Sequence, residues 1–227
     1  MKTITLAHYY TSPEVQAMAD FVGDSLDLAQ TAININPDRI VFAGVKFMAE
    51  STKMLLPNTE VILPHQDSTC SLVTQTDIQE LREWQLGFNV RSNKPSVHIM
   101  YINSSAEMKA EADVIVTSRN VEEICQYYHN KGRRILFSPD YNMGMYLKHE
   151  HPEWDIEVYT SVCEVHDKFK LEELEKEMRG WTDGSKSVIA HPESPMPILK
   201  KADFVGSTSK MLDWVKNFPH KVGTIWV

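Results

Sequence analysis

The sequence predicts an α/β protein made of three homologous αβα sandwich units with parallel sheets, placed around a pseudo-threefold axis, with the third unit truncated. The dipeptide Ala-Asp occurs three times, at Ala19-Asp20, Ala112-Asp113 and Ala202-Asp203. Short apolar segments also alternate with helix-prone segments of about ten residues, which is typical of parallel sheets covered by helices. Self-similarity at a fixed period of roughly 92 residues outranks other indications of fold. The predicted units are residues 1–92, 93–182 and 183–227.

Each unit is expected to contain its elements in the same order. The first strands are predicted at residues 4–7, 97–100 and 187–190, and the second strands at 21–23, 114–116 and 204–206. Helices are predicted between them at 13–19 and 106–112, and later strands at 39–43, 60–63, 134–137 and 155–159. The Glu- and Lys-rich segment 171–179 predicts a helix with a solvated face that bridges the second and third units.

The same polar residues recur around each Ala-Asp pair. The position eleven residues before the alanine holds His8, Tyr101 or His191, and the position two residues after these holds Tyr10, Asn103 or Glu193. A purely structural repeat would preserve its apolar positions, whereas here polar residues recur at predicted strand ends. Polar groups are costly to bury without partners, so these positions indicate a binding cavity.

Hydroxyl residues follow the second strands. Ser25, Ser118 and Thr208 each lie six residues after the alanine and precede helices such as those predicted at 121–130 and 210–217. Their position suggests N-caps. A helix N-terminus also offers free N–H groups and a positive dipole end, which bind phosphate or carboxylate without lysine or arginine.

Composition excludes several classes of protein. The 227 residues carry a net charge of -8, which disfavours nucleic acid and anionic membranes as partners. The sequence has neither an apolar run of the roughly 18 residues that span a bilayer nor a signal peptide, so we expect a cytoplasmic protein. It also lacks a glycine-rich nucleotide-binding motif and a Gly-x-Ser-x-Gly nucleophile elbow.

Two of the three cysteines follow the repeat. Cys70 and Cys163 lie 51 residues after the first and second alanines, which predicts a shared metal site, whereas Cys125 is off this spacing and is expected in the core. Two thiolates cannot complete a zinc site or hold a cluster. Further ligands are expected from His65, Asp67 or His166, or from a third cysteine that the spacing would place after Val227.

At these residues the sequence resembles quinolinate synthase, an iron-sulfur enzyme of NAD biosynthesis. The matching segments are 7–10, 19–26, 44–50, 101–107, 163–166, 191–193 and 206–209, in order along nearly the whole chain. The resemblance implies condensation of iminosuccinate, supplied by an L-aspartate oxidase, with dihydroxyacetone phosphate to give quinolinate. It also implies a 4Fe-4S cluster held by three cysteines, with one iron left open to act as a Lewis acid.

Carried over by position, the resemblance implies roles for individual residues. Cys70 and Cys163 would bind the cluster, Glu193 would be the general acid/base, and Tyr10 would close the site. The substrate would contact His8, Ser25, Tyr101, Asn103, Ser118, His191, Glu193 and Thr208.

The sequence departs from the family in places. Ser68-Thr69 precedes Cys70 where Ala-Gly is usual, Thr11 replaces Gln, and the family continues for some 70 residues that include the third cysteine. We therefore expect a C-terminally incomplete member. Two alternatives are a non-catalytic module that binds a dicarboxylate or phosphate, and a zinc hydrolase that uses Cys70, Cys163 and histidines.

Overall fold

The computed structural model describes residues 1–91, 94–181, 186–218 and 224–226, which form three parallel β-sheets. The first sheet has the order β2-β1-β3-β4, with β1 at Thr3–His8, β2 at Phe21–Gly23, β3 at Arg39–Ala43 and β4 at Glu60–Ile62. The second has the order β6-β5-β7-β8, with β5 at Ser96–Tyr101, β6 at Val114–Val116, β7 at Arg134–Ser138 and β8 at Ile156–Val158. The third has the order β10-β9-β11, with β9 at Lys186–Ala190, β10 at Phe204–Val205 and β11 at Thr224–Trp226.

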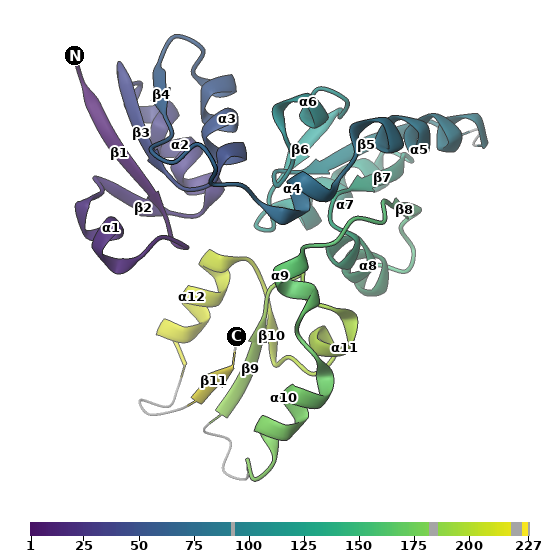
Figure 1. The fold of residues 1–227 in the computed structure, drawn as a ribbon. Helices are drawn as coiled ribbons and strands as arrows, with labels where there is room; N and C mark the ends of the chain where they lie inside the picture. The colour runs from purple at the N-terminus through teal and green to yellow at the C-terminus, as the bar shows by residue number, and fades with distance from the viewer. Residues whose placement is uncertain (92–93, 182–185, 219–223, 227) are drawn as a thin grey trace.

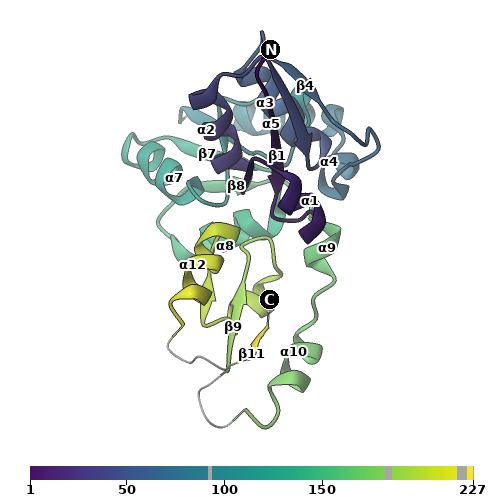
Figure 2. The same ribbon diagram turned by 90° about the vertical axis from the view of Figure 1, so that its left-hand side faces the viewer.

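Helices separate nearly all successive strands. Beside the first sheet lie α1 (Pro13–Met18), α2 (Ser25–Ile35) and α3 (Lys46–Leu55), and beside the second lie α6 (Ala106–Lys109), α7 (Val121–Asn130) and α8 (Tyr141–Glu150) (Figure 1). The chain reaches the second sheet through α4 (Ser71–Gln75) and α5 (Ile78–Arg91), and the third through α9 (Glu164–Asp167) and α10 (Leu171–Met178) (Figure 2). The third sheet carries α11 (Met196–Leu199) and α12 (Thr208–Lys216).

The α/β class and the parallel sheets expected from the sequence are confirmed. Strand bounds fall within a residue of those expected, but the short helix α6 ends at Lys109 and not at residue 112. It stops early because the chain turns there and Asp113 joins β5.

The aspartate of each Ala-Asp pair makes the same contact. Its N–H donates to a carbonyl of the first strand, and its carboxylate accepts the N–H of that same strand residue. These pairs are Asp20 with Thr5 (2.9 and 2.7 Å), Asp113 with His98 (3.0 and 2.8 Å) and Asp203 with Val188 (2.8 and 2.9 Å). The repeated aspartate therefore joins the start of each second strand to the first.

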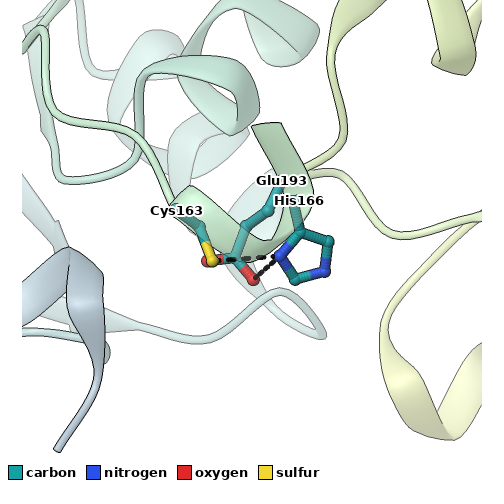
Figure 3. Close-up of side chains that lie close together, drawn as sticks. All are labelled: Cys163, His166 and Glu193. Atoms are coloured by element: carbon teal, nitrogen blue, oxygen red, sulfur yellow. Dashed lines mark hydrogen bonds and ion pairs between the residues drawn. The ribbon is translucent and has the colours of Figure 1, made fainter. Parts of the chain in front are cut away.

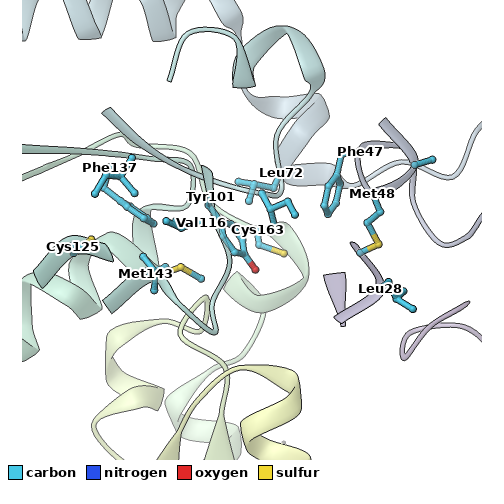
Figure 4. Packing of buried hydrophobic residues seen from close by; sticks show 14 of the residues in the cluster. Leu28, Phe47, Met48, Leu72, Tyr101, Val116, Cys125, Phe137, Met143 and Cys163 are labelled. Carbon is cyan, nitrogen blue, oxygen red and sulfur yellow. The ribbon is translucent and has the colours of Figure 1, made fainter. Parts of the chain in front are cut away.

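Apolar packing joins the first and second sheets. A single cluster of buried side chains extends from Leu28, Phe47 and Met48 through Leu72 of α4 to Phe137 and Met143 (Figure 4). The third sheet has its own cluster, formed by Leu174, Val188, Ala190, Ile198 and Leu199, against which Tyr146 of α8 packs. Helix α10 thus buries one residue, Leu174, and exposes most of the rest. Among the described residues, no helix is both long and apolar enough to cross a membrane.

Lys109 is buried where α6 meets the first sheet's helices. Its Nζ donates to the carbonyl of Ser104 and lies 5.3 Å from the centre of the Phe47 ring. Burial lowers the pKa of Lys109 to about 8, against the opposing effect of the Glu50 charge. In the unfolded chain the same amine titrates near its ordinary value.

Replacing Lys109 with methionine should remove a pH dependence of stability. Between about pH 8 and 10.5 the unfolded chain binds the proton that the folded chain has lost, so the unfolding free energy rises with pH. Relative to Lys109→Met, wild-type protein should gain up to about 3 kcal/mol across this window. Urea unfolding at several pH values measures the difference. Parallel profiles for the two proteins would contradict the burial of a titrating Lys109.

Gly144 permits close packing between α8 and the second sheet. A Cβ at this position would collide with Val158 and would lie 2.9 Å from Cδ1 of Phe137. Both neighbours belong to the strands that α8 covers, so neither can move freely.

Gly144→Ala should therefore destabilise the protein despite the higher helix propensity of alanine, worth about 1 kcal/mol. Overpacking costs typically about 1–3 kcal/mol, and we expect a net loss in the unfolding free energy. The control is Lys148→Ala, an exposed position on the same helix. Urea denaturation should place Gly144→Ala below this control; equal stability would show that the interface can yield.

Candidate functional site

One cavity of about 360 Å³ lies where strands of all three sheets end. Its wall contains every residue for which the sequence predicted a cluster-binding, substrate-binding, acid/base or site-closing role. These are His8, Tyr10, Ser25, Cys70, Tyr101, Asn103, Ser118, Cys163, His191, Glu193 and Thr208. The geometry brings them together although they lie up to 200 residues apart in the chain.

Corresponding strand ends supply the first set of side chains. His8 ends β1, Tyr101 ends β5, and His191 directly follows β9. All three are at least 95% buried. Two positions after these residues come Tyr10, Asn103 and Glu193. The strand has ended there and the chain has turned, so these side chains line the cavity as well.

Glu193 is the most buried carboxylate of the cavity, at 2% exposure. Its Oε2 lies 3.1 Å from Nδ1 of His191 and accepts a hydrogen bond from Tyr101 Oη at 3.4 Å. Its Oε1 accepts a hydrogen bond from Nδ2 of Asn103 at 3.5 Å, and its backbone carbonyl accepts one from Asn142 at 3.1 Å. Three side chains from the segments around the second sheet, those of Tyr101, Asn103 and Asn142, therefore hold this one residue, which follows β9 of the third.

These contacts set the charge of Glu193. Burial by itself would raise the pKa of its carboxyl group, but the hydrogen bond from His191, the charges of His191 and His166, and the hydrogen bond from Tyr101 lower it below its ordinary value. Glu193 is therefore ionised at neutral pH, as a general base must be.

His8 and Tyr10 pack against each other in the wall of the same cavity. Their ring centres are 4.2 Å apart, and the N–H of Tyr10 donates to Nδ1 of His8 at 3.2 Å. Burial lowers the pKa of His8 to about 4, so its imidazole is neutral. Tyr10 is the exposed member of this pair, at 67% exposure.

The prediction that Ser25, Ser118 and Thr208 cap helices is wrong. Asp24 caps α2 by accepting the N–H groups of Leu26 and Asp27, each at 2.9 Å, and Ser207 caps α12. Asn120 precedes α7, and its side chain bonds Thr117 instead. Because a neighbouring residue occupies each N-cap position, the three hydroxyls are not used as caps and line the cavity.

Sequence reasoning missed two charged residues at the junction of the sheets. Asp24 accepts a hydrogen bond from the hydroxyl of Ser209 on α12, and Arg119 forms an ion pair with Asp27 and lies 4.0 Å from Asp24. Arg119 is the one lysine or arginine among the residues that line the cavity. Aspartate is a strong N-cap residue, so the position of Asp24 before α2 was a usable signal. The position of Arg119 beside α2 depends on tertiary structure alone.

The two cysteines on the repeat spacing share the cavity. Cys70 and Cys163 occupy the N-cap positions directly before α4 and α9, whereas Cys125 is fully buried in the core, as expected. Burial raises the pKa of Cys70, and burial followed by the charge of Glu193 raises the pKa of Cys163 to about 12. Among the other candidate ligands, His166 lines this cavity and His65 lines a neighbouring one of about 400 Å³. Asp67 lines neither.

A thiol-specific cross-linker tests the shared cavity. Dibromobimane, which fluoresces after both of its arms have reacted, should join Cys70 to Cys163 at about pH 9, where more thiolate is present. Peptide mass mapping identifies the linked residues. Cys125→Ser should leave the fluorescence unchanged and Cys70→Ser should abolish it. A link that includes Cys125 would show that the thiols are arranged differently.

Comparison with known proteins identifies the family. The family model described as "Quinolinate synthetase A protein" matches residues 1–226. Proteins named quinolinate synthase from Alkaliphilus metalliredigens, Aquifex aeolicus and Methanopyrus kandleri are each 38% identical to the chain, over 94%, 96% and 93% of its length. The chain spans 67%, 65% and 70% of these relatives. The chain therefore belongs to the quinolinate synthetase A family, as the sequence motifs predicted.

Proposed function

We propose that the protein is a quinolinate synthase that condenses iminosuccinate with dihydroxyacetone phosphate. The products would be quinolinate, inorganic phosphate and two molecules of water, which balances the atoms. The observation that carries the proposal is the convergence of all eleven expected residues on one cavity in a chain of this family. Because iminosuccinate is the oxidation product of aspartate, an L-aspartate oxidase is the expected supplier.

Both proposed substrates are anions, and the cavity offers donors for them. Ser25 and Thr208 are the first residues of α2 and α12, where the helix dipole and the N–H groups that Asp24 and Ser207 do not accept favour negative charge. Arg119 adds a cation to the same wall. We assign carboxylate and phosphate binding to these groups, together with the hydroxyl of Ser118 and the amide of Asn103.

Proton transfer is assigned to Glu193. Ring formation requires that carbon-bound and nitrogen-bound protons be removed and that hydroxyl groups leave as water. An ionised carboxylate accepts such a proton, and the neighbouring His191, 3.1 Å away, can take it on or return it. His8 and Tyr101 would orient the substrate, and Tyr10, which is the most exposed of these residues, would cover it.

The cysteine positions are compatible with two ligands of a 4Fe-4S cluster. Both thiols line the cavity at the start of a helix, where backbone N–H groups of Leu72 and Val73, or of Val165 and His166, point at the sulfur. Such donors stabilise a thiolate. Among the described residues no third cysteine lines the cavity. When bound, the cluster would supply a Lewis acid that assists loss of water.

We further propose that the three sheets are repeats around a pseudo-threefold axis. The orders β2-β1-β3 and β6-β5-β7 correspond, and β10-β9-β11 follows the same pattern. The reciprocal Asp contact recurs in each. The proposed units remain residues 1–92, 93–182 and 183–227.

Anaerobic assay of the protein expressed from its complete reading frame tests the function. After reconstitution with iron and sulfide, it should form quinolinate from the two substrates, and Glu193→Gln should lower kcat at least about 100-fold. Glu164→Gln, an exposed residue near Cys163, is the control and should retain activity. A wild-type preparation that contains iron and sulfide but forms no quinolinate would refute the proposal.

A further inference from the structure

A sulfur, a nitrogen and an oxygen atom that could bind a metal ion lie close together in the side chains of Cys163, His166 and Glu193. Nδ1 of His166 lies 3.1 Å from Sγ of Cys163 and 3.9 Å from Oε2 of Glu193 (Figure 3). One atom from each of the three residues lies within 4.8 Å of the others. Cys163 and His166 come from a single turn at α9, whereas Glu193 comes from the loop after β9.

These separations suit a single metal ion. Bonds from zinc to sulfur, nitrogen and oxygen are about 2.3, 2.1 and 2.1 Å, so one ion can join sulfur and nitrogen only within about 4.4 Å of each other, and nitrogen and oxygen only within about 4.2 Å. The sulfur–nitrogen and nitrogen–oxygen distances of 3.1 and 3.9 Å meet this condition. A mixed sulfur, nitrogen and oxygen set favours zinc and similar divalent transition ions.

The same distances argue that His166 does not complete an iron-sulfur cluster. The protein ligands of a cubane cluster bind different iron atoms and point at it from separate corners. Two donors in hydrogen-bond contact cannot occupy two such corners. His166 and Cys163 are therefore arranged to chelate one ion.

Neighbouring groups already hold the donors. Tyr101 and Asn103 donate to the Glu193 carboxylate, and the N–H of Cys163 donates to the buried Asp140 at 2.8 Å. Partners of this kind orient metal ligands in known sites. All three donors also line the cavity, so an ion can reach them from it.

We propose that Cys163, His166 and Glu193 form a site for one divalent transition-metal ion, such as Zn²⁺. Three protein donors leave a further position for water or a substrate oxygen, as in catalytic zinc sites. The site does not rest on the proposed synthase activity. It excludes that activity when filled, because it uses the thiolate of a proposed cluster ligand and the proposed general base.

Cobalt is a suitable probe because its spectrum reports thiolate ligation. Protein freed of iron by a chelator and kept reduced and anaerobic should bind one Co²⁺ per chain, with a thiolate-to-cobalt charge-transfer band. His166→Gln should weaken Co²⁺ binding more than about 100-fold. A residue that only contacts a metal ligand costs about 10–100-fold in metal affinity when it is replaced, so a larger loss indicates that His166 is itself a ligand. Glu193→Gln should also weaken it, and Cys163→Ser should remove the band.

Cys70→Ser is the matched control. It removes the other cavity thiol, and with it a proposed cluster ligand, but should leave Co²⁺ affinity and the band unchanged. Far-ultraviolet circular dichroism selects variants that retain the wild-type fold; His166→Asn replaces His166→Gln if that variant fails this criterion. The proposal is overturned by absence of the band in wild-type protein, by its loss in Cys70→Ser, or by unchanged affinity in the folded His166 variant.

Discussion

The site depends on the polar contacts made by the buried carboxylate of Glu193. Tyr101 at the end of β5 and Asn103 just after it donate to its side chain, and Asn142 of α8 donates to its carbonyl. The first two sheets share an apolar cluster, whereas the third has a separate one. Polar contacts at the cavity therefore help to hold the third sheet in place. A residue proposed for chemistry therefore also connects the segments of the second and third sheets.

This arrangement follows from the parallel sheets. Parallel strands end at one edge, so polar residues placed after corresponding strands come together when the sheets meet edge to edge. Polar pairs there join different sheets: Asp24 with Ser209, Arg119 with Asp27, and Glu193 with Tyr101. Asp24 and Glu193 are buried and need such partners, whereas the ion pair of Arg119 with Asp27 is partly exposed. The hydrogen bonds that allow Asp24 and Glu193 to be buried therefore also hold together segments that line the cavity.

Much of the fold and the site could be predicted from the sequence because the repeat marks them at equal spacing. Apolar segments predicted the strands, and the polar frame identified the residues that line the cavity. The reciprocal bonds of Asp20, Asp113 and Asp203 explain why the marker dipeptide recurs, but spacing alone cannot show a bond. The contact of Arg119 with α2 and the approach of Glu193 to His166 depend on tertiary packing, which no local pattern encodes.

Hydrogen–deuterium exchange of Glu193→Ala, compared with wild-type protein, tests most directly whether this residue joins the third sheet to the rest. Removing the carboxylate takes away the acceptor for Tyr101 and Asn103 while leaving the apolar clusters intact. Exchange should accelerate in β9, β10 and α12 and remain unchanged in β1, β3, β5 and β7. Equal acceleration in all three sheets, or none in the third, would contradict the account.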